Sequence, residues 1–154
     1  MAESPSGGPY RFAAVASTYH LEYCDAMLLS AQRELRDHAI DVVRVPGAFE
    51  IPIAVQRLAR TGQYDGILAF GVVWSGKTYH ATEILRACTD ALMRIALDYD
   101  IPVFHEILSV SNEKDARART TGRLNRGIEA SHAALALLDS LHKAGLPAAH
   151  KIEG

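Results

Sequence analysis

The most distinctive chemical motif in the chain is the stretch 71–78, GVVWSGKT, which fits the P-loop pattern G-x-x-x-x-G-K-[ST]. In a P-loop, flexible backbone wraps the phosphates of a nucleotide, and an acidic residue at the end of another strand helps to hold Mg²⁺. Val72 and Val73 instead favour an extended backbone. Asp65 and Asp100 precede the nearest apolar runs rather than ending one. The sequence therefore argues against a nucleotide hydrolase.

A simpler anion site remains within this motif. Gly76, Lys77 and Thr78 stand between the end of a predicted strand and a predicted helix that begins near Ala81. Backbone N–H groups, the threonine hydroxyl and the helix dipole would together suit a phosphate monoester. The same three residues also fit a turn glycine, a solvated lysine and an N-cap threonine. Both interpretations stay open on this triplet alone.

The motif belongs to a chain in which short apolar runs alternate with amphipathic segments. Strands are predicted at 10–17, 40–47, 64–73 and 101–108, and helices at 21–38, 48–62, 81–100 and 128–145, with a short helix within 109–122. This alternation predicts a three-layer α/β/α sandwich around a four-stranded, mostly parallel sheet. We expect a flexible segment at 1–9, a single domain at 10–145 and a tail at 146–154.

The predicted fold brings four loops to one edge of the sheet. In open α/β sheets, ligands bind outside the carboxyl ends of the strands. The loops at those ends are 17–20, 46–50, 74–80 and 109–113. Each of them contains an aromatic residue, a carboxylate or a histidine, so we expect the functional site there.

Composition narrows the classes of function. The chain has 154 residues, of which 49% are hydrophobic and 22% charged, as in an ordinary globular protein without a membrane span. A formal charge of −2 without a basic block argues against nucleic acid as a partner. The start of the chain lacks the features of an export signal, so we expect a soluble, cytoplasmic protein. Cys24 and Cys88 fit small core residues better than a disulfide or metal pair.

Several segments taken together carry a family resemblance. They are VPGAFEIP at 45–52, YDGILAFGVV at 64–73, the G-x-T-x-H pattern at 76–80, IPVFHEIL at 101–108 and Arg119. From about residue 12 to 145 the chain resembles the lumazine synthases of riboflavin biosynthesis. The resemblance implies a flavodoxin-like topology. It also implies condensation of 5-amino-6-(D-ribitylamino)uracil with 3,4-dihydroxy-2-butanone 4-phosphate, giving 6,7-dimethyl-8-ribityllumazine with no metal and no cofactor.

The resemblance also assigns roles to residues. It implies that Tyr19, beside His20, stacks on the pyrimidine, whose edge meets the backbone near Val72, Val73 and Trp74. It places the ribityl chain on Ala48, Phe49 and Glu50, and the phosphate on Gly76, Lys77, Thr78 and Arg119. Arg126 is a further expected substrate-binding residue. Arg117 is a rival of Arg119 by spacing.

His80 matches the histidine that transfers protons in that family. Imine formation, loss of phosphate and ring closure all move protons near neutral pH, where an imidazole titrates. Since two substrates must also be held together, positioning can supply several kcal/mol, roughly 7–11 at best. Removal of His80 would then leave appreciable activity.

The chain departs from the usual residues of that family at several positions. These are Trp74, Ser75, Lys77, Ala81, His105, Glu106 and Arg126. Lys77 adds a cation to the phosphate loop, and Arg126 replaces a lysine. His105 stands where an apolar aromatic residue is usual and would give the pocket a second titratable ring. Glu106 stands where a glycine is usual.

These departures keep three alternatives open. The first is a binding module that holds a lumazine or flavin without turning substrates over, and the second is a purely structural shell protein. The third is a metal site built from histidines and a glutamate, although their spacing lacks the pattern of known sites. Its members would be His20, His80 and His105 with Glu50 or Glu106.

Assembly is expected in every case. Apolar residues of the predicted helix 81–100 cover more than one narrow stripe, which exceeds what contact with a single sheet needs. The resemblance implies pentamers with active sites between subunits, which in some members pair into decamers or build 60-subunit shells.

Overall fold

A computed structural model describes residues 7–76 and 79–148 of the chain. Its strands are β1 (Arg11–Ser17), β2 (Ala39–Val45), β3 (Gly66–Trp74) and β4 (Val103–Val110). They form one sheet in the order β2-β1-β3-β4, and every neighbouring pair is parallel. The predicted sheet is confirmed, including its flavodoxin-like strand order.

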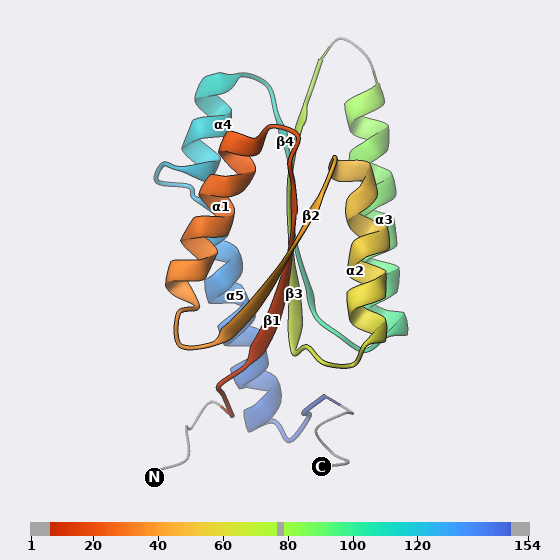
Figure 1. Cartoon of the computed structure of the whole chain (residues 1–154), viewed down its shortest axis with the longest axis vertical. Helices are drawn as coiled ribbons and strands as arrows, with labels where there is room; N and C mark the ends of the chain where they lie inside the picture. Colours follow the sequence, from red (N-terminus) through yellow and green to blue (C-terminus); the bar gives the residue numbers. More distant parts are fainter. Residues whose placement is uncertain (1–6, 77–78, 149–154) are drawn as a thin grey trace.

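Helices cover both faces of this sheet (Figure 1). One layer contains α1 (Leu21–Glu34), α4 (Glu113–Thr120) and α5 (Arg126–Lys143). The other contains α2 (Ile51–Arg60), which follows the 3₁₀ turn η1 (Ala48–Glu50), and α3 (His80–Asp98). The predicted three-layer α/β/α sandwich is confirmed. Among the described residues, none of the helices combines the length and the apolar character of a membrane span.

Strand β3 separates two hydrophobic cores. Leu68 and Phe70 belong to the core under α1 and α5, whereas Ile67 and Ala69 belong to the core under α2 and α3. All of β3 except its last residue, Trp74, is buried, as expected of an interior strand of a parallel sheet that is covered on both faces.

Element ends differ from the predicted ones for local reasons. Helix α1 ends at Glu34, before a turn at 35–37; His38, which follows the turn, accepts at Nδ1 a hydrogen bond from the backbone N–H of Tyr10 at 2.8 Å. The predicted helix 48–62 begins as the 3₁₀ turn η1, and Pro52 stands in the first turn of α2, where a missing N–H costs little. Strand β4 continues to Val110, which pairs with Trp74.

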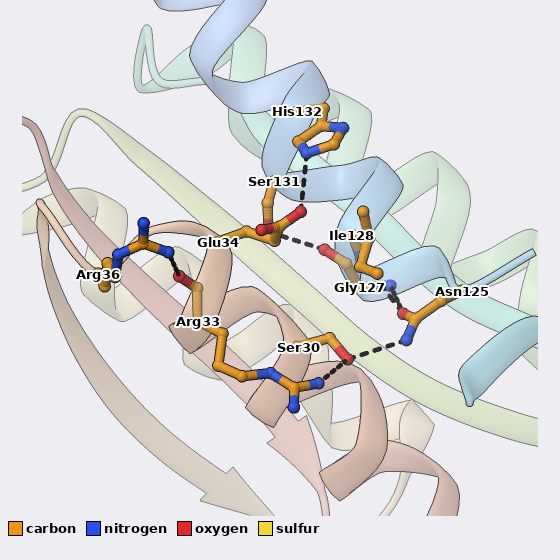
Figure 2. A network of polar contacts seen from close by, with 9 residues as sticks. All are labelled: Ser30, Arg33, Glu34, Arg36, Asn125, Gly127, Ile128, Ser131 and His132. Atoms are coloured by element: carbon orange, nitrogen blue, oxygen red, sulfur yellow. Dashed lines mark hydrogen bonds and ion pairs between the residues drawn. The ribbon is translucent and has the colours of Figure 1, made fainter. Parts of the chain in front are cut away.

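The start of α5 is fastened to α1 (Figure 2). Asn125 Oδ1 accepts hydrogen bonds from the backbone N–H groups of Gly127 at 2.9 Å and Ile128 at 3.2 Å, so the helix begins earlier than predicted. Asn125 Nδ2 donates to Ser30 Oγ in α1 at 2.9 Å. A Cβ at Gly127 would lie 2.2 Å from the carbonyl oxygen of Met27, so the two helices touch backbone to backbone. These contacts fix the first turn of α5.

Candidate active site

The carboxyl ends of all four strands lie at one edge of the sheet, at the top of Figure 1. Backbone hydrogen bonds join these ends across the sheet. Thr18 N–H donates to the carbonyl of Val45 at 2.8 Å, and Ser75 N–H donates to the carbonyl of Val110 at 2.8 Å. The loops 17–20, 46–50 and 109–113, and the described part of 74–80, therefore follow strand ends on a single rim, as predicted.

Aromatic rings gather where β1 and β3 end. The ring of His20 lies 4.4 Å from that of Tyr19 and 5.2 Å from that of Trp74, and Tyr23 lies 6.0 Å beyond Trp74. Tyr19 is 65% exposed and Trp74 36% exposed, so both rings can still be covered by a ligand. The rings are tilted against one another by 35–59°, and the exposed faces of Tyr19 and Trp74 offer surfaces on which a planar ring could stack.

His20 holds this group together at a conformational cost. Its φ of 56° lies in the left-handed region, which costs about 1 kcal/mol or more for a residue with a Cβ. Burial lowers the pKa of its imidazole below the usual value, so the ring is neutral at neutral pH. His20 is therefore suited to stacking and hydrogen bonding rather than to carrying a positive charge.

The 3₁₀ turn η1 contributes a second polar and aromatic group to the rim. Phe49 is 65% exposed. The carbonyl of Ala48 accepts a weak hydrogen bond from Cys88 Sγ of α3 at 3.4 Å. A Cβ at Gly47 would lie 3.2 Å from Glu50 Oε1, which places this carboxylate back over its own loop. The turn thus presents a carboxylate, a ring and backbone groups side by side, as the predicted site for a polyol chain requires.

Backbone of β3 is available beyond the end of β1. The β1–β3 ladder ends at Ala16 and Phe70, whereas the β3–β4 ladder continues to Trp74 and Val110. Val72 and Val73 therefore have a strand partner on the β4 side alone, although their side chains are buried. Their position agrees with the predicted contact between backbone and the edge of a ring.

His80 begins α3 and is exposed to solvent. Gly76, before it, is also exposed and has no atom near the place where a Cβ would stand. Lys77 and Thr78 of the predicted phosphate loop lie outside the described residues. An exposed imidazole at the amino end of a helix can exchange protons with a ligand on the rim.

His105 points into the layer of α2 and α3. Its Nδ1 accepts the backbone N–H of Ile107 at 3.0 Å, and its Nε2 lies 2.7 Å from Thr89 Oγ1 in α3. Burial lowers the pKa of this ring. Thr89 follows His80 by nine residues, about 13 Å along a helix. Within one chain the side chain of His105 thus bonds to α3, well away from His80.

Arg119 and Arg126 lie on the opposite face of β4. Arg119 donates to the carbonyl of Ser109 at 2.7 Å, and its side chain is 23% exposed. The rival Arg117 pairs with Glu113 and is 59% exposed. Of the two, Arg119 is the one held against the carboxyl end of a strand.

Arg126 is the first residue of α5 and lies near Arg119. Its Nη1 donates to Glu129 Oε2 at 2.7 Å. Its Nε is buried and has no hydrogen-bond partner in the described part of the chain. Glu106 of β4 faces both arginines, and burial raises the pKa of its carboxyl to about 7 in spite of them. Two cations and a half-buried acid therefore share one corner of the domain.

The candidate residues thus form separate groups within one chain. Tyr19, His20 and Trp74 stand between the ends of β1 and β3, and Ala48 to Glu50 follow β2. His80 begins α3, on one face of the sheet, whereas Arg119 and Arg126 belong to α4 and α5, on the other.

The remaining chemical alternatives gain no support here. Within the described ranges, no three His, Cys, Asp or Glu side chains gather in a way that could hold a metal ion. Cys24 and Cys88 are free and buried, and burial raises the pKa of both thiols, that of Cys24 to about 12. Neither cysteine is therefore an activated nucleophile.

A cavity of about 530 Å³ lies at the opposite edge of the sheet, near the ends of α3 and α5. Leu97, Pro102 and Leu141 are among its mostly apolar walls. None of the predicted site residues lines this cavity. The chemistry-bearing residues therefore favour the open rim as the functional site.

Sequence reasoning did not assign three residues of the site to a role. Tyr23 extends the aromatic group, Glu129 holds Arg126, and Asn125 anchors it from the preceding position. For Asn125 a signal was present, because an asparagine before an apolar periodic segment is typical of an N-cap. For Glu129 the i,i+3 spacing to Arg126 was a weaker signal.

Comparison with known proteins identifies the family of the chain. Residues 9–142 match the family described as 6,7-dimethyl-8-ribityllumazine synthase. The protein of that name from Xanthomonas euvesicatoria pv. vesicatoria (strain 85-10) is 39% identical over 135 residues, which are 84% of this chain and 88% of the relative. The one from Xylella fastidiosa (strain 9a5c) is 38% identical over 145 residues, 90% of this chain and 93% of the relative. The chain therefore belongs to the 6,7-dimethyl-8-ribityllumazine synthase family.

Proposed function

We propose that the protein is a transferase of riboflavin biosynthesis that makes 6,7-dimethyl-8-ribityllumazine. It condenses 5-amino-6-(D-ribitylamino)uracil with 3,4-dihydroxy-2-butanone 4-phosphate and releases inorganic phosphate and water. The observation that carries this proposal is the family match, which spans residues 9–142 and so includes every rim loop. A cytoplasmic location is part of the same proposal, since this is metabolic chemistry on small, water-soluble substrates.

The pyrimidine substrate lies at the aromatic side of the rim in this proposal. Its ring stacks on Tyr19, with His20 and Trp74 beside it, and its edge meets the backbone of Val72 and Val73. The supporting observation is that the ring of His20 lies within contact distance of both Tyr19 and Trp74. The ribityl chain extends over Ala48 to Glu50, where carbonyl and carboxylate oxygens can accept hydrogen bonds from its hydroxyls.

The phosphate of the second substrate lies between the loop 76–78 and the arginines at 119 and 126. An Arg fork matches two oxygens of a phosphate, and the amino end of α3 adds its dipole. His80, which begins that helix, moves the protons that imine formation, phosphate loss and ring closure require. Holding the amine and the ketone within reach of each other supplies a large part of the rate, roughly 7–11 kcal/mol at best.

Neighbouring subunits complete the site in this proposal. The supporting observation is that His80 stands on one face of the sheet while Arg119 and Arg126 stand on the other, at the edge strand β4. In a ring of subunits, β4 of one chain can meet the rim of the next. Exposed apolar side chains on α3, among them Met93 at 62% and Leu97 at 74%, offer surface for such contacts. A homo-oligomer, whether pentamer, decamer or 60-mer, is therefore part of the proposal.

The decisive experiment mixes the purified protein with both substrates. We expect lumazine absorbance and fluorescence to rise together with one released phosphate per product. Light scattering on the same sample gives the size of the assembly. A folded oligomer that binds the product stoichiometrically but never turns substrates over would instead identify a non-catalytic binding homologue, and a large particle that binds neither would identify a shell protein.

A further inference from the structure

Glu106 is an acidic residue of the site, and the proposed function gives it no role. In β4 it has the same parity as Phe104 and Leu108, which pack in the core under α1 and α5. Its side chain therefore enters the layer of α4 and α5, whereas its neighbour His105 enters the opposite layer and bonds Thr89. The two titratable residues, adjacent in sequence, belong to different environments.

The groups that face Glu106 come from each element on its side of β4. Helix α5 contributes Arg126 and Glu129, and α4 contributes Arg119, to which Asp115 is paired at 3.8 Å. On β3 the residue in register is the apolar Phe70. Helix α3 packs on the other face of β4 through His105. Glu106 thus faces two cations, the acid Glu129 and hydrocarbon, and one of the cations is paired with Asp115.

The hydrogen bonds of the arginines leave capacity for another acceptor. Arg119 uses one Nη to bind a backbone carbonyl, and Arg126 uses one Nη to bind Glu129. Arg126 Nε is buried without a partner among the described residues, and such a donor favours any acceptor that can reach it. A tetrahedral oxyanion next to both guanidinium groups would supply acceptors to them.

Charge decides the state of Glu106 in that complex. Two arginines stand against Glu106, Glu129 and Asp115, so the corner carries a net charge of −1 when Glu106 is ionised and zero when it is neutral. A doubly charged anion arriving there repels an ionised Glu106 but not a protonated one. The carboxyl already titrates near neutral pH, since its pKa is about 7. A modest added field is enough to change its protonation.

We propose that Glu106 is the proton-coupled partner of an oxyanion site formed by Arg119 and Arg126, accepting a proton when a doubly charged oxyanion binds and releasing it when the anion leaves. In the empty site the two arginines tolerate an ionised Glu106, although the corner then carries a net charge of −1. In the occupied site the neutral carboxyl removes the repulsion and can donate a hydrogen bond. The inference rests on the proposed function, because that function requires phosphate to bind and leave at these arginines. It assigns Glu106 a positioning role rather than a step in the condensation.

Sulfate is the probe that isolates this proton. Unlike phosphate, it stays doubly charged throughout the neutral range, so any proton taken up on binding comes to the protein. Calorimetric titration of the purified oligomer with sulfate, in two buffers of different ionisation enthalpy, counts those protons. At pH 8 we expect the wild type to take up about 0.4 to 0.9 of a proton more per sulfate than Glu106→Gln, according to whether the pKa of Glu106 rises by one unit or by more. The dissociation constant of the wild type should rise up to about tenfold per pH unit above pH 7, while that of the variant rises less.

A matched control removes the same charge nearby. Glu113→Gln neutralises an exposed acid of α4 that pairs with Arg117, and its proton uptake and dissociation constants should follow those of the wild type. Equal proton uptake in the wild type and in Glu106→Gln would overturn the proposal. Should Glu106→Gln fail to fold, the ¹³C carboxyl shift of Glu106 in the wild type is followed against pH with and without sulfate. An apparent pKa that rises by one unit or more with sulfate supports the proposal, and an unchanged one overturns it.

Failure of this inference and failure of the proposed function give different results. If the wild type makes the lumazine and sulfate binding leaves Glu106 untouched, the synthase assignment stands and the role of Glu106 is wrong. If the wild type never makes the lumazine yet sulfate binding takes up the Glu106 proton, the oxyanion site stands and the synthase assignment is wrong.

Discussion

His105 and Thr89 form a hydrogen bond of 2.7 Å that joins β4 to α3. Because the N–H of Ile107 donates to Nδ1, the neutral ring carries its proton on Nε2 and donates it to the threonine hydroxyl. Protonating the ring would place an N–H on Nδ1, directly against the backbone N–H of Ile107. The geometry and the lowered pKa therefore agree that His105 is neutral in the folded chain.

His105 should make the protein less stable in mild acid. Its folded pKa lies below the unfolded value near 6.5, so the unfolded chain binds the proton more readily and stability falls as pH drops below about 6.5. His105→Phe should remove part of this loss, which thermal unfolding at pH 5 and pH 7.5 measures. His132→Asn, at a histidine 65% exposed in its side chain, serves as the control. An unchanged difference between the two pH values in His105→Phe would contradict the assignment.

Arg119→Gln should mainly weaken the binding of the phosphorylated substrate. Losing a charge-assisted contact of about 1.5–3 kcal/mol corresponds to roughly a 10- to 150-fold rise in KM for the butanone phosphate. The KM of the pyrimidine should change little. Arg117→Gln is the matched control, because this arginine belongs to the same helix but pairs with Glu113 at the surface. Equal effects of the two variants would remove the preference for Arg119.

Tyr19→Ala should mainly weaken the binding of the pyrimidine substrate. A stacked aromatic pair contributes about 0.5–1.5 kcal/mol beyond its buried area, so KM for the pyrimidine should rise by about 2- to 12-fold or more. Tyr99→Ala, at an exposed tyrosine that ends α3, controls for the loss of a ring elsewhere. Steady-state kinetics with each substrate varied in turn separates the two effects. If the Tyr19 variant weakens the binding of both substrates equally, our assignment of the two substrates to separate parts of the rim is wrong.

His80→Asn should lower kcat while leaving both KM values close to those of the wild type. General acid–base catalysis contributes typically 100- to 10,000-fold, but positioning by the rest of the rim remains, so the loss should lie near the lower end of that range. Single-turnover measurements report the chemical step directly. Wild-type kcat in the variant would exclude His80 from proton transfer.

Asn125→Ala should destabilise the fold and weaken phosphate binding together. Loss of an N-cap costs about 0.5–2 kcal/mol, and the variant also loses the hydrogen bond to Ser30. Asn112→Ala removes a cap of α4 without touching that link, and is the appropriate comparison. We expect Tm to fall in both variants, and further in Asn125→Ala because it also loses the bond to Ser30; calorimetry measures both decreases. The variant at 125 should show the larger rise in KM for the phosphorylated substrate because Arg126 follows it directly.

Patterns along the chain predicted the fold well because the strands are short, apolar and separated by strong helical periodicity. The continuous apolar run that ends at Val73 predicts a strand buried on both faces, and β3 is such a strand. Ends of elements were harder to predict, since His38 and Asn125 act through contacts with Tyr10 and Ser30, which are distant in sequence. Periodicity carries no information on such partners.

The site was predictable in its residue types but less so in its grouping. Tyr19 and Trp74 follow strands that are neighbours in the sheet, so their proximity follows from topology. The direction of His105 depends on strand parity and on a threonine in α3, and the environment of Glu106 depends on how α4 and α5 pack over β4. These are tertiary properties, which a single sequence does not encode in any local signal.

The contact between α1 and α5 at Gly127 also affects the position of Arg126. With only a hydrogen in place of a side chain, Gly127 lets the two helices approach until the carbonyl of Met27 leaves no room for a Cβ. Arg126 is bonded to this glycine along the backbone, so the closeness of two helices sets the point from which a guanidinium reaches out. A residue with no functional group thereby aims a positive charge.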